Sequence, residues 1–166
     1  WTSDNTDAYE RARIQYGTSL CYPPSAMSAH ISVCPNHLTG RTTPLESRYA
    51  VASLCAFGYE LDLTAMTDEE RDALARYTRE YREFEPLVLH GDMYRLARMD
   101  VDGMYAAALL SKDKKTAYVA GITGHTGANA LQKRLKIYGL DEARRYRVRE
   151  TGVVASGRAL RTAGLL

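Results

Sequence analysis

The strongest constraint on the fold is a change in hydrophobic periodicity near Gly91. Before this point, apolar residues at helical spacing, such as Ala8 and Ala12, alternate with short strand-like runs. After it, apolar residues form only short runs, which are separated by turn-forming residues. The first pattern favours a parallel α/β assembly, and the second favours an antiparallel β-sandwich. We therefore predict two units, residues 1–91 and residues 92–166.

The first unit is expected to contain three helices and two strands. Gly17 is expected to end the first helix, and Pro44 to begin the second. Thr67 and Glu70 have the spacing of a capping box at the start of the third helix, and Pro86 predicts its end. The expected helices cover residues 7–17, 44–57 and 68–85, and the expected strands cover residues 29–33 and 59–63.

The second unit is expected to consist of short strands joined by polar or glycine-rich turns. Residues 111–115 read as a hairpin loop, and residues 121–129 as a glycine-rich connection. No stretch of the chain approaches the ~20 apolar residues of a membrane-spanning helix, so we expect no membrane partner. The expected strands cover residues 94–96, 104–110, 116–120, 131–137 and 146–148.

The net charge of +2 conceals an asymmetry between the two units. Residues 1–91 hold eight Arg and thirteen Asp and Glu, whereas residues 92–166 hold fourteen Lys and Arg and seven Asp and Glu. A basic half can bind nucleic acid, but here the basic residues are scattered along strand-like stretches and accompany no recognised nucleic-acid motif. We therefore expect solvated strand faces and no nucleic-acid partner.

The three cysteines lie in the first third of the chain, and their odd number leaves one unpaired in any disulfide scheme. Cys21, Cys34 and Cys55 have apolar neighbours, so each is expected to be a small buried residue in a reducing compartment. Cys34 and His37 have a ligand-like spacing, but no second pair completes a metal site. We expect a cytoplasmic protein without a bound metal.

The first seven residues, Trp1–Asp7, combine an acidic turn with a helix start. Asp7 has the position of an N-cap and shares a helix face with Arg11, so local structure accounts for it. Asp4 lies before the helix and close to the indole of Trp1. A carboxyl group beside an apolar ring is partly desolvated, which favours its protonated form and suits it to proton donation. A capping role for both aspartates is the competing interpretation.

The chain resembles the bacterial α-galactosidases, or melibiases, of glycoside hydrolase family 36. The likeness begins in the tryptophan-led acidic turn and follows the family's order along nearly the whole chain. It continues through residues 14–19, 22–23, 29–32, 35–37, 39–41, 57–62 and 91–96. The resemblance implies the last part of a (β/α)8 catalytic barrel in residues 1–91 and a C-terminal antiparallel β-sandwich in residues 92–166.

The resemblance also implies a retaining mechanism with two carboxyl groups and no cofactor. Asp4 matches the family's catalytic acid/base, and Asp7 is the alternative candidate for that role. The aspartate nucleophile belongs to a Lys-Trp-Asp type motif that this sequence lacks, and substrate-binding residues remain unassigned. His30, Asn36 and Arg41 lie on loops that could approach the pocket, although holding the loops by hydrogen bonds is an equal explanation. Expected partners are melibiose- or raffinose-type α-galactosides and further copies of the full-length chain, as a tetramer.

Other functions fit the sequence less well. A serine hydrolase could use Ser32 and His30, but the Gly-x-Ser-x-Gly elbow is absent. A phosphate-binding loop at residues 121–127 lacks the Gly-Lys-Ser/Thr element. The more serious alternative is a non-catalytic structural or sugar-binding β-module with a barrel remnant.

The chain starts without Met in the middle of a motif, and the family's sandwich continues beyond residue 166. These features favour a fragment of a longer enzyme. A retaining glycosidase cannot complete its reaction without a nucleophile, so the isolated chain is expected to be inactive.

Overall fold

Helices and strands alternate through the first half of the chain, and strands dominate the second half. The computed structural model describes residues 2–124, 126, 128 and 133–165. The first half comprises α1 (Ala8–Thr18), η1 (Pro24–Ala26), β1 (Ser28–Ser32), α2 (Leu45–Ala52), β2 (Ala56–Glu60), η2 (Leu63–Ala65) and α3 (Asp68–His90). The second half comprises β3 (Asp92–Ala97), α4 (Met99–Asp102), β4 (Met104–Leu110), β5 (Ala117–Thr123), β6 (Arg145–Arg147), β7 (Val154–Ser156) and α5 (Gly157–Thr162).

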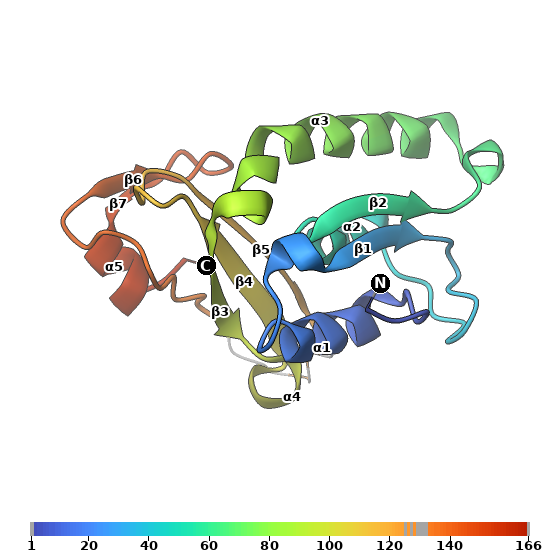
Figure 1. Ribbon diagram of the computed structural model, residues 1–166, viewed down its shortest axis with the longest axis horizontal. Helices are drawn as coiled ribbons and strands as arrows, with labels where there is room; N and C mark the ends of the chain where they lie inside the picture. The colour runs from blue at the N-terminus through green and yellow to red at the C-terminus, as the bar shows by residue number, and fades with distance from the viewer. Residues whose placement is uncertain (1, 125, 127, 129–132, 166) are drawn as a thin grey trace.

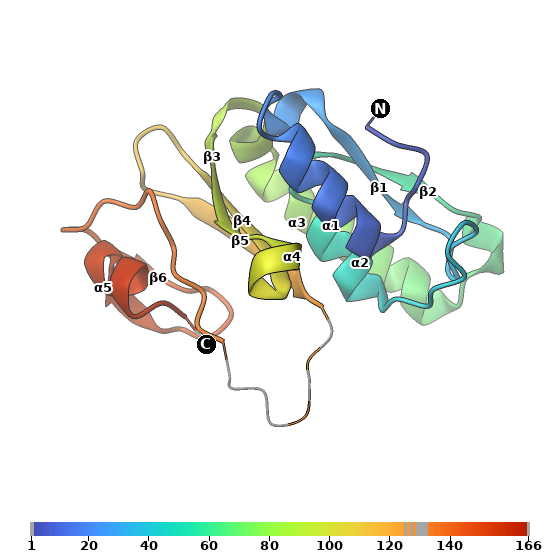
Figure 2. The ribbon, with the colours of Figure 1, turned by 90° about the horizontal axis from the view of Figure 1, so that it is seen from below.

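Strands β1 and β2 form a parallel pair with α2 as the connecting helix. Their register matches Ser28 with Ala56 and Ser32 with Glu60, so both strands end at the same edge. Figure 1 shows α3 along one side of the pair and α1 along the other, and Figure 2 agrees with this arrangement. Ala29 and Ile31 pack in a buried cluster with Leu74 of α3, whereas His30 lines a small cavity with Arg11 of α1, as strand alternation predicts.

The second half contains two antiparallel sheets. Strands β3, β4 and β5 form one sheet in that order, and β6 pairs with β7 in the other. The central strand β4 is buried along almost its whole length, because its alanines and leucines face packed elements on both sides. Sequence patterning therefore located the longest strands of this half correctly.

One hydrophobic core joins the two halves of the chain. Its buried residues come from α1, α2, α3, α4, β4 and β5 and from the turn after α2, and include Leu54, Phe84 and Leu109. The ring of Phe84 stacks on Tyr118 of β5, with 3.5 Å between ring centroids. The hydroxyl groups of Tyr118 and Ser53 form a hydrogen bond, with 2.9 Å between their oxygen atoms. The two halves thus pack against each other as one body.

Helix α3 does not stop before Pro86, contrary to the prediction from sequence. It begins at the expected capping box of Thr67 and Glu70 and continues to His90. Leu87 and Val88 are buried in the shared core, and this packing offsets the hydrogen bond that proline removes. Figure 1 shows the last turns of α3 bent away from its long run, as an internal proline requires.

Several other boundaries also differ from the predictions. The second helix ends at Ala52, and Gly58 lies inside β2 instead of closing a helix. Gly17 lies within α1, whose C-cap is Ser19. In the predicted strand at residues 131–137, the described part forms only an isolated bridge between Leu135 and Leu165. Helix α4, strand β7 and helix α5 have no counterpart among the predicted elements. The glycine-rich connection at residues 121–129 lies partly outside the described residues.

The fold class is therefore mixed helix and sheet. Within the described residues, the first half contributes two parallel strands, and these do not close a barrel. The second half contributes two separate antiparallel sheets. No helix in the described part of the chain is long and apolar enough to cross a membrane.

We predict that Leu109→Ala lowers the unfolding free energy by about 2–5 kcal/mol, because it opens a cavity in the shared core. Leu109 is fully buried, whereas Leu89 is 46% exposed, so Leu89→Ala should change stability by no more than about 0.5 kcal/mol. Denaturant unfolding followed by circular dichroism and tyrosine fluorescence measures both effects. Two well-separated transitions in the parent chain would contradict a core shared by the two halves.

Candidate active site

The acid turn, defined as Thr2–Asp7, lies at the edge where β1 and β2 end. The Ser32 hydroxyl, at the end of β1, donates to the Thr6 carbonyl over 3.1 Å. The Asn36 amide donates to the Thr6 hydroxyl over 3.2 Å. Because Ser32 is paired with Glu60, the end of β2 lies at the same edge. This edge of parallel strands is the usual position of ligand sites in α/β proteins.

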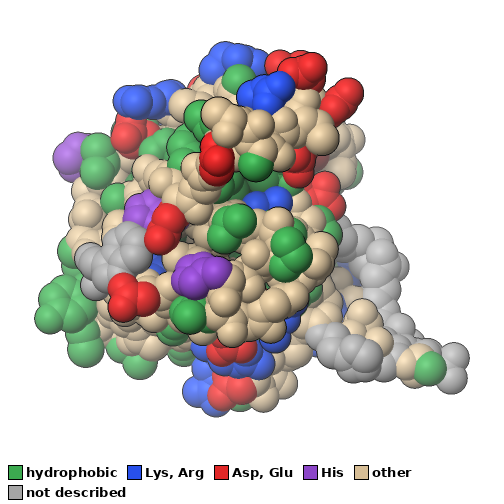
Figure 3. Space-filling model, turned by 90° about the vertical axis from the view of Figure 1, so that its right-hand side faces the viewer, with side chains coloured by type: hydrophobic (Ala, Val, Ile, Leu, Met, Phe, Trp, Pro, Cys, Tyr) green, Lys and Arg blue, Asp and Glu red, His purple; other side chains and the backbone are tan. Residues whose placement is uncertain are grey.

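Side-chain bonds to the backbone fix the shape of the acid turn. The Asn5 amide N–H donates to the Ser3 hydroxyl over 3.1 Å, and the Asp7 N–H donates to the Asn5 side chain over 3.1 Å. The Arg11 guanidinium donates to the Ser3 carbonyl over 3.4 Å. These bonds hold the residues on either side of Asp4, which is itself exposed. Figure 3 shows acidic and histidine side chains side by side on this face of the molecule.

Asp7 is a buried structural anchor. Its side chain is fully buried, and one carboxylate oxygen accepts from the backbone N–H groups of Tyr9 and Glu10 over 2.9 and 3.1 Å. The Thr39 hydroxyl donates to the other oxygen over 2.8 Å, and Arg41 forms an ion pair with the carboxylate. A carboxylate with both oxygens engaged in this way is poorly placed to reach a substrate. Asp7 therefore supports the fold through these contacts.

Arg11 does not pair with Asp7, although the two share a helix face. Its guanidinium instead donates to the carbonyls of Ser3 and Ser28, and the residue is 5% exposed. The partner of Asp7 is Arg41, which is 34 residues further along the chain. The helical spacing of Asp7 and Arg11 suggested a local ion pair that does not form. It carried no information about a partner on the loop after β1.

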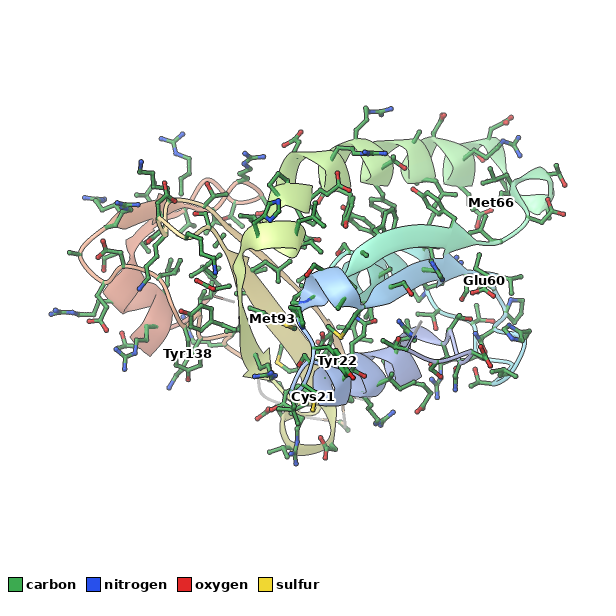
Figure 4. The ribbon with its side chains drawn as sticks, viewed as in Figure 1. Cys21, Tyr22, Glu60, Met66, Met93 and Tyr138 are labelled. Atoms are coloured by element: carbon green, nitrogen blue, oxygen red, sulfur yellow. The ribbon has the colours of Figure 1, made fainter. Side chains whose placement is uncertain are left out.

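His30 and Glu60 lie on neighbouring strands at the same edge. The His30 Nδ1 atom is 3.6 Å from a Glu60 carboxylate oxygen, and Figure 4 shows Glu60 at the end of β2. The imidazole covers Gly58, where a Cβ atom would lie 2.7 Å from the His30 Cδ2 atom. Burial lowers the pKa of His30, and the Glu60 charge opposes this effect in part. At neutral pH the ring is therefore uncharged.

A small polar cavity lies behind the acid turn. His30, Thr6, Arg11 and Arg48 contribute to its walls, together with residues of α1 and α2. Its volume of about 10 Å³ admits little more than one water molecule. The described residues therefore place acidic and basic groups at this edge but do not enclose a pocket of sugar size there.

The other residues named from sequence have structural contacts. Asn36 bonds to Thr6 and caps its own loop, and Arg41 binds Asp7, so the hydrogen-bonding explanation describes both. Cys55 is buried as predicted, but Cys21 is exposed, which contradicts its expected burial. Among the described residues, no group of three or more His, Cys, Asp or Glu side chains could hold a metal ion. Trp1, expected to desolvate Asp4, lies outside the described residues.

Comparisons with known proteins give consistent matches along the chain. The melibiase family matches residues 1–91, and the glycosyl hydrolase family 36 C-terminal domain matches residues 104–166. An alpha-galactosidase of Lactobacillus acidophilus is 42% identical over 157 residues, which are 95% of this chain and 21% of that protein. The chain therefore spans about a fifth of the length of this curated relative.

Solved structures of similar proteins have nearly the same fold. The galactosidase domain of an alpha-galactosidase–sucrose kinase has a TM-score of 0.97 and 38% identity, covering 99% of this chain and 23% of that one. The family 36 alpha-galactosidase AgaA of Geobacillus stearothermophilus has a TM-score of 0.95 and 42% identity over the same shares of the two chains. Variants of that enzyme have been solved in complex with raffinose and with stachyose.

We predict different stability effects for the two aspartates of the acid turn. Asp7→Ala should lower the unfolding free energy by about 2 kcal/mol or more. The substitution removes a helix cap and leaves buried hydrogen-bond donors without an acceptor. Asp4→Ala should change it by no more than about 0.5 kcal/mol, because Asp4 is exposed. Urea denaturation of the two variants measures both values. Equal losses would show that Asp4 also supports the fold.

We also predict that His30 titrates below its ordinary pKa of about 6.5, because burial disfavours the charged ring. Stability should fall as the pH is lowered between the unfolded and folded pKa values, since the unfolded state then binds more protons. Glu60→Gln should lower the pKa of His30 further, whereas Asp62→Asn should leave it nearly unchanged. A pH titration of the ring signals by NMR measures these shifts. A rise after Glu60→Gln would contradict the prediction.

Proposed function

The chain belongs to the melibiase family, and on that premise we propose that it forms the C-terminal part of a retaining α-galactosidase. In this proposal, β1 and β2 are the last two strands of a (β/α)8 barrel, and residues 92–166 belong to a C-terminal β-sandwich. One observation carries the proposal most directly: Asp4 is exposed in a fixed turn at the edge where the parallel strands end. That edge is where barrel enzymes place their catalytic groups.

Asp4 acts as the acid/base in the proposed reaction. A carboxylate nucleophile from a part of the enzyme outside residues 1–166 attacks the anomeric carbon, while the Asp4 carboxylic acid protonates the departing glycosidic oxygen. This step forms a covalent galactosyl–enzyme. The Asp4 carboxylate then takes a proton from water, whose oxygen attacks the anomeric carbon and releases galactose. The two carboxyl groups return to their starting states, so no cofactor is consumed.

The proposed substrates are α-galactosides of the melibiose and raffinose type. Support comes from the raffinose and stachyose complexes of the Geobacillus stearothermophilus enzyme, which is 41–42% identical to this chain. We also propose that the full-length enzyme is a tetramer and that it is located in the cytoplasm. Three free cysteines among the described residues are compatible with a reducing compartment.

A non-catalytic sugar-binding β-module is the second candidate. A groove of about 990 Å³ between α3, β5 and β6 favours it, because its wall combines the rings of Phe84, Tyr118 and Tyr146 with basic side chains. Aromatic faces and hydrogen-bonding groups can hold a sugar without any reaction. Isothermal titration of the chain with galactose and raffinose, with and without Tyr146→Ala, tests this function separately from turnover.

We predict that Asp4→Ala in the full-length protein slows hydrolysis of melibiose, which has a poor leaving group, by ~10²–10⁴. The rate of glycosidic bond cleavage in 4-nitrophenyl α-galactoside should fall less, because its leaving group needs little protonation. Azide should restore part of the rate, since it replaces the water that Asp4 activates. Steady-state kinetics on both substrates measure these effects.

Residues 1–166 alone should show no turnover, because the nucleophile is missing. Activity of this chain above that of an Asp4→Ala, Asp7→Ala double variant would mean that a second carboxylate within it acts as the nucleophile. Normal hydrolysis of melibiose by Asp4→Ala, with the loss in Asp7→Ala instead, would transfer the role of acid/base to Asp7.

A further inference from the structure

Asn36 closes the loop that follows β1. Its side-chain oxygen accepts from the backbone N–H groups of Leu38 and Thr39, each over 3.0 Å. Its own backbone N–H donates to the Arg41 carbonyl over 2.9 Å, and its carbonyl accepts from the N–H of Gly40 over 2.8 Å. The residue is 5% exposed. Every polar group of Asn36 except its amide nitrogen therefore serves the loop itself.

The amide nitrogen of Asn36 extends from the loop to the acid turn. The N–H groups of Leu38 and Thr39 can only donate, so the side-chain atom that they contact must be the oxygen. The Nδ2 atom of Asn36 therefore donates to the Thr6 hydroxyl, over 3.2 Å and across 30 residues of sequence. Figure 1 and Figure 2 show this loop beside the start of α1. One neutral hydrogen bond thus joins the loop after β1 to the acid turn.

Thr6 is the residue through which β1 and its loop hold the acid turn. It is 5% exposed, and both of its oxygen atoms accept hydrogen bonds from this side. Its hydroxyl accepts from the loop amide, and its carbonyl accepts from the Ser32 hydroxyl over 3.1 Å. Thr6 lies two residues after Asp4, and the Asp7 N–H closes the segment by donating to the Asn5 side chain over 3.1 Å. A shift of Thr6 is therefore transmitted to Asp4 through one short, internally bonded segment.

We propose that Asn36 is a positioning residue for the acid/base of the proposed α-galactosidase, because its amide fixes Thr6 and Thr6 fixes the turn that carries Asp4. This inference rests on the proposed function of Asp4. A general acid must lie within hydrogen-bond reach of the departing oxygen, and a displacement of ~1 Å can lower the rate by about 10²-fold. Asp4 is exposed, so burial of its own side chain does not supply this accuracy. The bond from Asn36 to Thr6 restricts where the carboxyl group can lie.

The test removes the hydrogen bond between Asn36 and Thr6 from the full-length protein. Thr6→Val replaces the hydroxyl by a methyl group of similar size and leaves the bonds within the loop in place. It should lower kcat/KM for melibiose by about 10-fold and that for 4-nitrophenyl α-galactoside by less than about 3-fold, because melibiose depends more on a well-placed acid. Azide should raise kcat on the nitrophenyl substrate, because a misplaced carboxylate activates water poorly. Thr6→Ser keeps the hydroxyl, so both kcat/KM values should stay within about 2-fold of the parent.

A double-mutant cycle tests whether Asn36 acts through Thr6. Asn36→Ala removes the donor of the same hydrogen bond, so by itself it should also reduce hydrolysis of melibiose selectively. In the Thr6→Val background, Asn36→Ala should change the ratio of the two kcat/KM values by no more than about 2-fold, because the link is already broken.

The matched control is Thr43→Val, the same substitution near the end of the same loop. Thr43 is 4% exposed, and its carbonyl, which accepts from Arg48 over 3.1 Å, is unaffected by the change. The kinetics of this variant on both substrates should stay within about 2-fold of the parent. If Thr6→Val does not fold, Thr6→Ala removes the same acceptor without placing a methyl group against the Asn36 amide, and it should give the same selective loss. Thermal unfolding of each variant separates folding losses from kinetic ones.

The outcomes separate the role of Asn36 from the proposed function. Equal losses on both substrates in Thr6→Val, or no loss on melibiose, would overturn the positioning role. Additive effects of Asn36→Ala and Thr6→Val on the ratio would show that Asn36 does not act through Thr6. Absence of turnover in the parent protein, or melibiose hydrolysis that Asp4→Ala leaves unchanged, would instead refute the proposed function. A selective loss in Thr6→Val that is absent in Thr6→Ser and Thr43→Val supports the inference.

Discussion

The buried carboxylate of Asp7 is the interaction on which the geometry of this edge depends. It caps α1, accepts from Thr39 and pairs with Arg41, so a single side chain joins a helix start to the loop after β1. A fully buried carboxylate is tolerated only because every contact supplies a donor. Since Asp7 follows Asp4 by three residues, its anchorage also determines where Asp4 can point. The acid turn is held in place because its last residue, Asp7, is buried and bonded on both oxygens.

The buried and the exposed aspartate at this edge thus have different roles. Asp7 contributes its charge to the fold, and Asp4 keeps its side chain at the surface, where a substrate could be reached. On the neighbouring strands, the His30 Nδ1 atom lies 3.6 Å from the Glu60 carboxylate. Such an arrangement of titratable groups at the end of parallel strands is typical of catalytic sites, which need fixed electrostatics at little reorganisation.

Packing of the two halves gives this edge its support. Helix α3 carries the chain past Pro86, and Phe84 stacks on Tyr118 of the second half. Arg95 of β3 donates to Ser19 at the end of α1, so the helix that follows the acid turn is held at both ends. A change in the second half can therefore reach the acid turn through α1, although the two regions are distant in sequence.

The sequence by itself determined the features that depend on neighbouring residues. Periodicity located α1, α3 and most strands, the capping box fixed the start of α3, and the motif order identified the family. Tertiary structure decided what depends on distant partners. Pro86 stays within a helix because core packing outweighs its missing hydrogen bond, and Asp7 pairs with Arg41 instead of Arg11 because the loop after β1 folds back onto the helix start.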